Sequence, residues 1–316
     1  INSSNVDIIN KNINYNDTWI KNNVRYTTIN IKDSNINGRG NGITNYGIVN
    51  FYSGTIKSES YTNVSSYGTE FNIYGGYFES TSYCLSNTRG TMNITGGEVL
   101  CNRGAIRATY YNSPGGTVNI GGTFKINSQS KGAGIELDYS TVNIKDSVEI
   151  FSNTTSAIIV GNTSDNYTNN PTTLNILGNN IIRSSAGNAI NSKKSKSVIN
   201  IGTKDGNVNK EYPKLISSKE YPSLYSVGTT NYYDGIITGK KNSSIKANIE
   251  DSEDGYDLFI NDNGNDLEDV VLEKPTLETF GNVAKIDDTY YPSIKSAVES
   301  LPDSEEKTIE LLKDVR

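Results

Sequence analysis

Histidine is absent from the chain, and this absence excludes several kinds of site. Nucleophilic sites made of Ser, His and Asp, or of Cys and His, use the imidazole as a base, and many zinc sites use it as a ligand. The two cysteines are also too few for a zinc site made only of thiolates. We therefore expect none of these sites in the chain.

Long hydrophobic runs are lacking too, and hydrophobic residues make up only 34% of the 316 residues. No run approaches the length of a transmembrane helix, and Ile1 begins inside patterned sequence without a signal peptide. We therefore expect no membrane insertion in this segment. We also expect the chain to be a piece of a longer protein.

Positive charge is not concentrated on any one element, and the net charge is −6. Residues 1–246 hold 23 Lys and Arg against 16 Asp and Glu, whereas residues 247–316 hold 6 against 19. Nucleic-acid-binding proteins gather Lys and Arg on one face or element. A mildly basic body with an acidic end therefore predicts that nucleic acid is not a partner.

What the chain does contain is a short recurring pattern, seen at 90–99 as GTMNITGGEV. In nearly every copy an asparagine stands between two apolar residues, and apolar residues at every second position are typical of a strand with one buried face. The asparagines are then predicted to point outward and to stack in one column. They recur in steps of 20 to 32 residues, at Asn30, Asn50, Asn72, Asn93, Asn119, Asn143, Asn175, Asn200 and Asn231.

Each copy continues with two further short elements. Paired glycines often follow the asparagine strand, as at Gly96-Gly97, where a tight corner needs unusual backbone angles. A second strand resumes there, and a third element places a small residue before an apolar one, as at Ala105-Ile106. Three short strands per unit predict an all-β fold, a right-handed parallel β-helix of about nine rungs. An antiparallel sandwich is the alternative, but hairpins would not keep one residue in register through nine copies.

The two cysteines fall in different columns of this alignment. Cys84 takes the small inward position that Ala holds elsewhere, and Cys101 ends a second strand where other rungs place Ser58 or Ser80. Because the columns differ, the alignment favours two free, partly buried thiols, with a disulfide as the alternative. So few cysteines suit a bacterial surface protein that does not rely on disulfides.

The chain changes character after Asn231. Residues 225–240 still form a rung, 245–260 are expected to be a closing strand pair, and the acidic segment 261–269 follows. We predict a β-helix module at 1–272, a linker at 273–282, and at 283–316 a small α+β segment that begins a following module or packs as a cap. Ser293 is expected to cap a helix there. The apolar face of that helix is expected at Ile294, Ala297, Val298 and Leu301.

Residues 283–315, VAKIDDTYYPSIKSAVESLPDSEEKTIELLKDV, carry a family resemblance. They resemble the opening of modules in large repeat-containing surface proteins of Gram-positive bacteria, which continue into a pectin-lyase-like β-helix. Residues 225–260, with NYYDGIITGK and GYDLFI, are similar to the way such modules close. The resemblance implies a secreted or cell-surface location and further modules in the same polypeptide, but it supplies no catalytic residue.

A groove for a ligand is predicted where two loops, 109–116 and 161–172, enlarge the rungs on either side of a short one. Arg107 and Glu136 are expected to be close neighbours there, with Asp138 one outward position farther along. The other interpretation is an exposed ion pair beneath two variable loops, contributing under about 1 kcal/mol. The predicted floor is Arg107, Glu136, Asp138 and Tyr139, and the predicted edges are Tyr110, Tyr111, Asp165 and Tyr167.

Three further features have a structural and a ligand-binding interpretation. The asparagine column is expected to be a ladder of amides rather than a ligand site. The acidic segment 261–269 offers Asp262, Asp266 and Asp269 to calcium, but it lacks the pattern of an EF-hand and reads better as a solvated turn. The run SKKSKS at 192–197 is expected to be solvated, with attraction of an anionic glycan as the alternative.

These observations favour a non-enzymatic surface module without a cofactor. It would be a stalk or adhesin segment that binds a glycan or a host surface component, or that only acts as a spacer. The alternative is a polysaccharide lyase or hydrolase of the same fold with Arg107, Glu136 and Asp138 as its catalytic residues. Polygalacturonase-like chemistry needs a histidine, so the lyase variant of this alternative would use a calcium-binding carboxylate and an Arg or Lys base.

Overall fold

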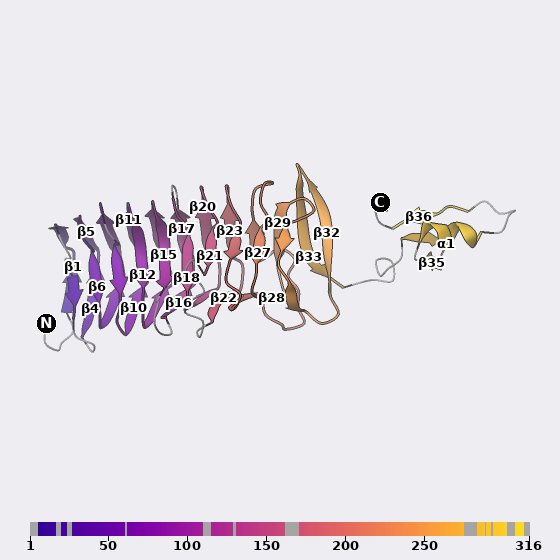
Figure 1. The fold of residues 1–316 in the computed structure, drawn as a ribbon. Coiled ribbons are helices and arrows are strands. Elements are labelled where there is room, and N and C mark those ends of the chain that lie inside the picture. Colours follow the sequence, from indigo (N-terminus) through magenta and orange to yellow (C-terminus); the bar gives the residue numbers. More distant parts are fainter. Residues whose placement is uncertain are drawn as a thin grey trace. The chain divides into compact units, whose positions relative to one another are not determined.

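The computed structural model describes residues 6–16, 20–23, 27–60, 62–109, 115–128, 131–161, 171–274, 283–287, 289–291, 293–301 and 307–312. The chain divides into two compact units, one formed by 1–253 with 260–271 and the other by 254–259 with 272–316. The larger unit is a coil of short strands stacked along one axis (Figure 1). The all-β, parallel β-helix prediction is therefore confirmed.

Three long sheets run the length of the coil, each receiving one strand from every rung. We call them sheets A, B and C, in the order in which the chain enters them. Sheet A contains β1 (Val6–Ile9), β4 (Thr28–Lys32), β7 (Ile48–Phe51), β10 (Glu70–Ile73), β13 (Thr91–Ile94), β16 (Thr117–Ile120), β19 (Thr141–Ile144), β22 (Thr172–Ile176), β25 (Ser197–Ile201), β28 (Thr229–Tyr232) and β31 (Ile249–Ser252).

Sheet B ends in a hairpin, whereas sheet C is parallel throughout its described strands. Sheet B contains β2 (Asn12–Tyr15), β5 (Ser34–Gly38), β8 (Gly54–Ser58), β11 (Tyr77–Ser80), β14 (Glu98–Cys101), β17 (Lys125–Ser128), β20 (Glu149–Ser152), β23 (Ile181–Ser184), β26 (Lys214–Ile216), β29 (Ile236–Lys240), β33 (Leu267–Glu273) and β32 (Asp257–Gly264). Sheet C contains β3 (Ile20–Asn22), β6 (Ile43–Asn45), β9 (Val64–Ser66), β12 (Tyr83–Asn87), β15 (Gly104–Thr109), β18 (Ile135–Asp138), β21 (Ile158–Val160), β24 (Ile190–Ser192), β27 (Leu224–Ser226) and β30 (Ile245–Lys246).

The predicted asparagine column exists and is a continuous amide ladder on the outer face of sheet A. From Asn50 to Asn231, each side-chain amide donates to the asparagine oxygen of the preceding rung, at 2.7–2.9 Å. Asn30 donates in the same direction to Asp7 at 2.8 Å. Aspartates hold the same position at both ends of the column, Asp7 in β1 and Asp251 in β31. Two strands are therefore added to the nine predicted copies.

The interior of the coil is filled by the apolar residues that flank each asparagine. Phe71, Ile73 and Ile94 are at most 1% exposed, and their neighbours in the adjacent rungs are equally buried. Burying one such side chain contributes about 1.5–3 kcal/mol. Each rung can bury its apolar residues only against its neighbours, so the coil is stabilised by stacking.

Corners after the sheet A strands need glycine because successive rungs approach closely there. Gly76 and Gly97 both have positive φ, at 102° and 105°. A Cβ atom on Gly97 would lie 2.6 Å from the carbonyl oxygen of Gly76. The paired-glycine signal in the sequence therefore marks a backbone contact between rungs as well as a turn.

Cys84 and Cys101 form a disulfide, so the prediction of two free thiols was wrong. Cys84 lies in β12 of one rung and Cys101 ends β14 of the next, and their Cα atoms are 5.9 Å apart. The two columns lie in different sheets, but only Thr81 and Ser82 separate those sheets at this corner. Inward side chains on the two sides of so short a corner meet in the interior, at a normal disulfide separation.

The coil closes later than the sequence indicated. Residues 245–246 and 249–252 still form the parallel rung strands β30 and β31, so they are not the predicted closing pair. The last strand to pair with the parallel part of sheet B is β33, which runs antiparallel to β29. Buried Glu268 of β33 accepts hydrogen bonds from the backbone of Asn242 and Ser244 at 2.6 and 2.8 Å. This carboxylate fixes the last turn of the coil to the closing strand.

The smaller unit contains a three-stranded antiparallel sheet and one short helix. The elements are β34 (Ala284–Ile286), β35 (Thr289–Tyr291), α1 (Ile294–Glu299) and β36 (Glu310–Leu311). Ser293 caps α1 as predicted, accepting from the Ser296 backbone at 3.0 Å. Ala297 packs in the small core, but Val298 is 52% exposed and was wrongly assigned to the apolar face. A helix of six residues presents less than two full turns to the sheet.

Ile94→Asp is expected to destabilise the coil by about 3 kcal/mol or more, because it places a carboxylate in the packed interior. Asn93→Ser should cost about 1–2 kcal/mol, since it removes one donated and one accepted ladder bond. Ile9→Asp, at a position that is 48% exposed, is the matched control and should cost least. Urea denaturation measures all three, and equal losses for Ile94→Asp and Asn93→Ser would show that the inner and outer faces are reversed.

Candidate functional site

One outward-facing column on sheet C gathers most of the polar and aromatic side chains with a potential function. In consecutive strands it contains Ser86, Arg107, Glu136, Ile159, Asn191, Tyr225 and Lys246. The predicted adjacency of Arg107 and Glu136 is confirmed, because they are paired in the register of β15 and β18. Tyr225 and Lys246 of this column were not predicted as neighbours from the sequence.

A cluster around Tyr83 occupies the middle of this face. The Tyr83 hydroxyl donates to Glu136 at 3.0 Å, reaching across the intervening strand β15. Gly104 makes this reach feasible, since a Cβ atom there would lie 2.8 Å from the Tyr83 ring. The guanidinium groups of Arg103 and Arg107 lie 5.5 and 5.2 Å from the ring centroid. The aromatic ring therefore lies against two cations and hydrogen-bonds to one carboxylate.

Burial changes the acid–base behaviour of this cluster. Glu136 is only 8% exposed, and burial raises the pKa of its carboxyl, against the lowering effects of the Tyr83 hydrogen bond and of Arg107 and Arg103. Burial also raises the pKa of Tyr83, and the negative charge of Glu136 adds to this effect. Tyr83 therefore keeps its proton and acts as a hydrogen-bond donor that fixes Glu136 in place.

Asp138 takes part in a buried ion pair that the sequence did not predict. Its carboxylate lies 2.9 Å from the ammonium group of Lys194, and the two side chains are 1% and 3% exposed. The same ammonium lies 3.1 Å from the ring centroid of Tyr139. The side chain of Lys194 passes over Gly161, where a Cβ atom would lie 2.5 Å from it. Lys194 is therefore part of the packed structure, and the prediction that this lysine is solvated was wrong.

The predicted groove is placed only in part. Tyr110, Tyr111, Asp165 and Tyr167 lie outside the described residues. Of the predicted floor, Glu136, Asp138 and Tyr139 are 8%, 1% and 3% exposed. Glu136 accepts the hydrogen bond from Tyr83, whereas Asp138 and Tyr139 both contact Lys194. Arg107 is the most accessible of the four. The ligand-binding role of these residues stays a prediction.

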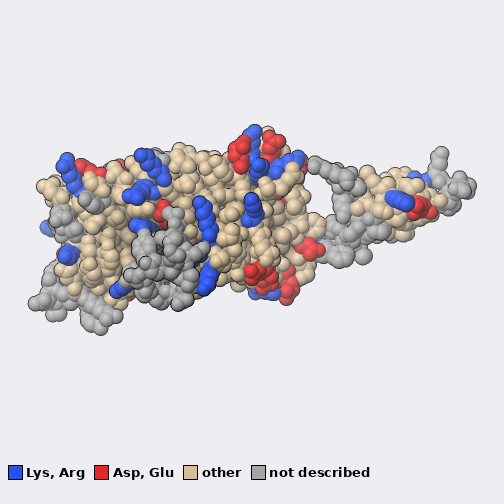
Figure 2. Space-filling view, in the orientation of Figure 1, with Lys and Arg blue, Asp and Glu red and all other residues tan. Residues whose placement is uncertain are grey.

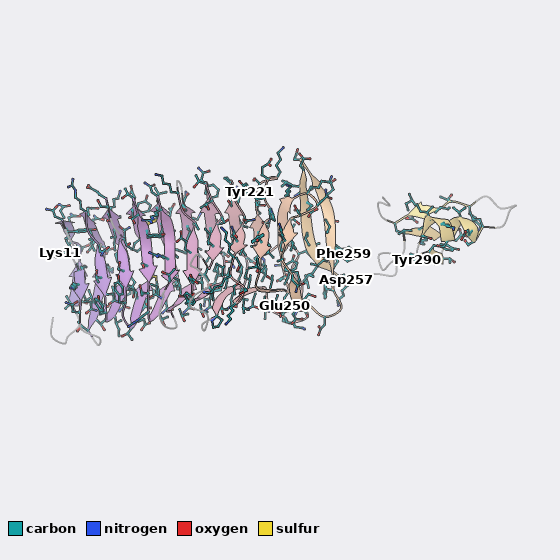
Figure 3. All side chains as sticks on the ribbon, viewed as in Figure 1. Lys11, Tyr221, Glu250, Asp257, Phe259 and Tyr290 are labelled. Atoms are coloured by element: carbon teal, nitrogen blue, oxygen red, sulfur yellow. A yellow bond between two sulfur atoms is a disulfide. The ribbon has the colours of Figure 1, made fainter. Side chains whose placement is uncertain are left out.

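A second groove, of about 650 Å³, lies farther along sheet C and was not identified from the sequence. The groove is lined by Tyr225 and Asn191, and by Glu220 and Pro222 on either side of Tyr221, which lies near the upper edge of the coil in Figure 3. Its other lining residues are Asn188, Lys193, Lys240, Asn242, Ser243, Ile245 and Lys246. A small residue before an apolar one recurs at Ser223-Leu224 and Ser244-Ile245. Extending the third-strand alignment through these pairs would have found Tyr225 and Lys246.

The three carboxylates proposed for calcium lie in the hairpin of β32 and β33, and each has a partner of its own. Asp262 pairs with Lys241, and Asp266 lies 3.5 Å from Lys219. Asp269 accepts from Thr238 at 2.5 Å and from an asparagine amide of the same hairpin. No group of three or more metal-ligating side chains is found among the described residues. Calcium binding stays a prediction that these contacts do not favour.

Another acidic group lies near the closing end, at Asp205, Asp234 and Glu253. Half-buried Asp234 accepts hydrogen bonds from the backbone of Asn209 and Gly235. Burial raises the pKa of Asp234 to about 6, and the charges of Asp205 and Glu253 contribute in the same direction. Figure 2 shows acidic side chains gathered mainly at this end of the coil, whereas basic ones are spread along it.

Comparison with protein-family models gave no match, and neither a curated protein nor a solved structure matched the chain significantly. Within the described residues, no helix is long and apolar enough to cross a membrane.

Lys194→Ala is expected to lower the free energy of unfolding by about 3–5 kcal/mol, because it removes the cation from a buried carboxylate. Lys193→Ala is the control: this neighbouring lysine is exposed, and its loss should change stability by less than about 0.5 kcal/mol. Both values come from urea denaturation. If the two variants lost the same stability, the buried ion pair would not contribute as described.

Asp234→Asn is expected to change how stability depends on pH. Because its folded pKa of about 6 lies above the ordinary value of 3.8, the folded protein holds a proton that the unfolded chain releases between these values. Asp234 therefore lowers stability as the pH rises from about 4 to about 6. The asparagine keeps the acceptor oxygen but has no charge, so the variant should be more stable than the wild type at pH 7 and equal to it near pH 4.

The experiment for Asp234 is a series of urea denaturations from pH 4 to pH 7. Asp257→Asn, at an exposed position, is the control and should follow the wild type. Parallel pH profiles for the wild type and Asp234→Asn would contradict the assignment.

Proposed function

We propose that the chain is a non-enzymatic β-helix module of a bacterial cell-surface protein, an adhesin or stalk segment that binds a glycan. The observation that carries this proposal is the groove on sheet C, in which a tyrosine, side-chain amides and lysines line an open hollow of about 650 Å³. Volumes of this order are typical of small-molecule sites. Aromatic rings pack against the apolar faces of sugars, while amides and ammonium groups bond their polar substituents.

The rigidity of the coil supports a binding role. The groove lining comes from the sheet C strands β24, β27 and β30, from the end of β29 and from the turns beside them. Strands stacked in register hold these side chains at a fixed spacing of about 4.8 Å. A preformed site binds without an ordering cost, which favours recognition of a repeating ligand by a repeating surface.

Location and partners belong to the same proposal. The resemblance of residues 283–315 to modules of Gram-positive surface proteins supports a secreted, wall-associated polypeptide with further pectin-lyase-like modules. A glycan of a host surface is then the partner that the groove would meet.

The enzymatic alternative, a polysaccharide lyase or hydrolase, would use Arg107, Glu136 and Asp138. Two of these groups already have partners within the coil, since Glu136 accepts from Tyr83 and Asp138 pairs with Lys194. A catalytic acid or base has to reach the proton that it transfers, so these contacts favour binding over catalysis.

Tyr225→Ala is expected to weaken glycan binding about tenfold, because an aromatic contact contributes about 0.5–1.5 kcal/mol beyond the area it buries. A glycan array identifies the ligand, and isothermal titration with that glycan measures the change. Tyr74→Ala, an exposed tyrosine on another face, is the control and should bind like the wild type. Unchanged binding by Tyr225→Ala would discard the groove, and polysaccharide cleavage that is lost in Arg107→Ala would replace the proposal with the enzymatic alternative.

A further inference from the structure

The lysines that line the sheet C groove differ from the adjacent lysines in the chain, because the adjacent ones form ion pairs with carboxylates. Two pairs of adjacent lysines border the groove, Lys193-Lys194 and Lys240-Lys241. In each pair the second lysine has a carboxylate partner, Asp138 for Lys194 and Asp262 for Lys241. The first lysine of each pair is exposed and lines the groove. In each pair, the second lysine thus forms an ion pair within the protein, and the first lysine lines the groove.

A third lysine completes the set. Lys246 in β30 also lines the groove, with its ammonium 5.7 Å from the Tyr225 ring centroid. Within the described part of the chain, no carboxylate lies within ion-pair distance of Lys193, Lys240 or Lys246. Glu220 is the one acidic residue in the lining. The groove therefore has three cationic groups and one anionic group. None of the three ammonium groups forms an ion pair with a carboxylate of the described residues.

We infer that this groove recognises an acidic glycan, a polysaccharide whose sugars carry carboxylate or sulfate groups. The inference rests on the proposed function and adds the ligand class to it. Lys193 follows β24, Lys240 ends β29 and Lys246 lies in β30, so the positive charge of the lining comes from three separate elements rather than from one point. This arrangement suits a sugar that stacks on the ring while its acidic substituents reach ammonium groups at the rim.

The direction of the ligand follows from the strand order. Asn191, Tyr225 and Lys246 occupy the same column in three consecutive rungs. Contacts repeated at about 4.8 Å therefore run along the axis of the coil. A linear polymer that lies along this axis meets an amide, an aromatic ring and a cation in turn, whereas a single small anion would use only one of them.

The charge of the groove itself supports this ligand class, with three lysines and one glutamate in the lining. The lysine contacts are exposed to solvent, and binding should therefore weaken as salt concentration increases. A local groove of moderate positive charge favours an acidic glycan over nucleic acid.

The test compares the chain with two triple variants of equal net charge. Lys193→Gln, Lys240→Gln and Lys246→Gln together remove the groove cations, whereas Lys11→Gln, Lys32→Gln and Lys131→Gln together remove three exposed lysines elsewhere. Surface plasmon resonance is run on immobilised polygalacturonate, heparin and neutral dextran at several salt concentrations. Circular dichroism melting checks that both variants are folded.

We expect the wild type and the control variant to bind polygalacturonate or heparin, with affinity that falls with salt, and the groove variant to bind at least tenfold more weakly. Preference for one of the two polymers identifies carboxylate or sulfate as the group recognised. Equal binding by both variants, or equal binding of dextran, would overturn the inference and leave a glycan-binding function in place. Binding to no glycan, here or on the array, would remove the proposed function itself.

Discussion

Register between successive rungs is the constraint on which the rest of the structure depends. An asparagine amide can donate to the rung before it and accept from the rung after it only if both neighbours hold the same position. The ladder keeps this arrangement from Asn30 to Asn231 although the steps between copies vary by more than ten residues. Extra residues therefore have to leave the sheets as loops and turns, and it is these excursions that give the otherwise uniform coil a distinct face.

Sheet C shows how the coil accommodates function within that constraint. Long side chains reach past the adjacent rung to the next one, as Tyr83 does to Glu136 and Lys194 does to Asp138. In both cases a glycine in the intervening rung, Gly104 or Gly161, leaves the space that the side chain crosses. Glu136 and Asp138, which the sequence suggested as catalytic residues, are therefore buried in the packed structure. The accessible lysines line the separate groove around Tyr225.

Much of the fold could be predicted because it depends on period-two patterning and on one repeated residue. The stacking of the asparagines and the adjacency of Arg107 and Glu136 both follow from register alone. The disulfide did not, because it joins columns of two sheets across a two-residue corner. The burial of Lys194 and the groove around Tyr225 were missed because they depend on side-chain reach and on turns of unequal length. A linear alignment of strands contains no information on either.

The asparagine ladder has a direction, because every amide donates toward the amino-terminal end of the coil. Nine side-chain dipoles therefore point the same way, with their positive ends toward Asp7, whose carboxylate accepts the last bond. At the other end the column meets Asp251, which has no proton to donate and instead accepts from Tyr233 and Lys204. The surface of sheet A thus carries a row of aligned dipoles with a fixed sign, an electrical polarity along the coil axis that the count of charged residues does not reveal.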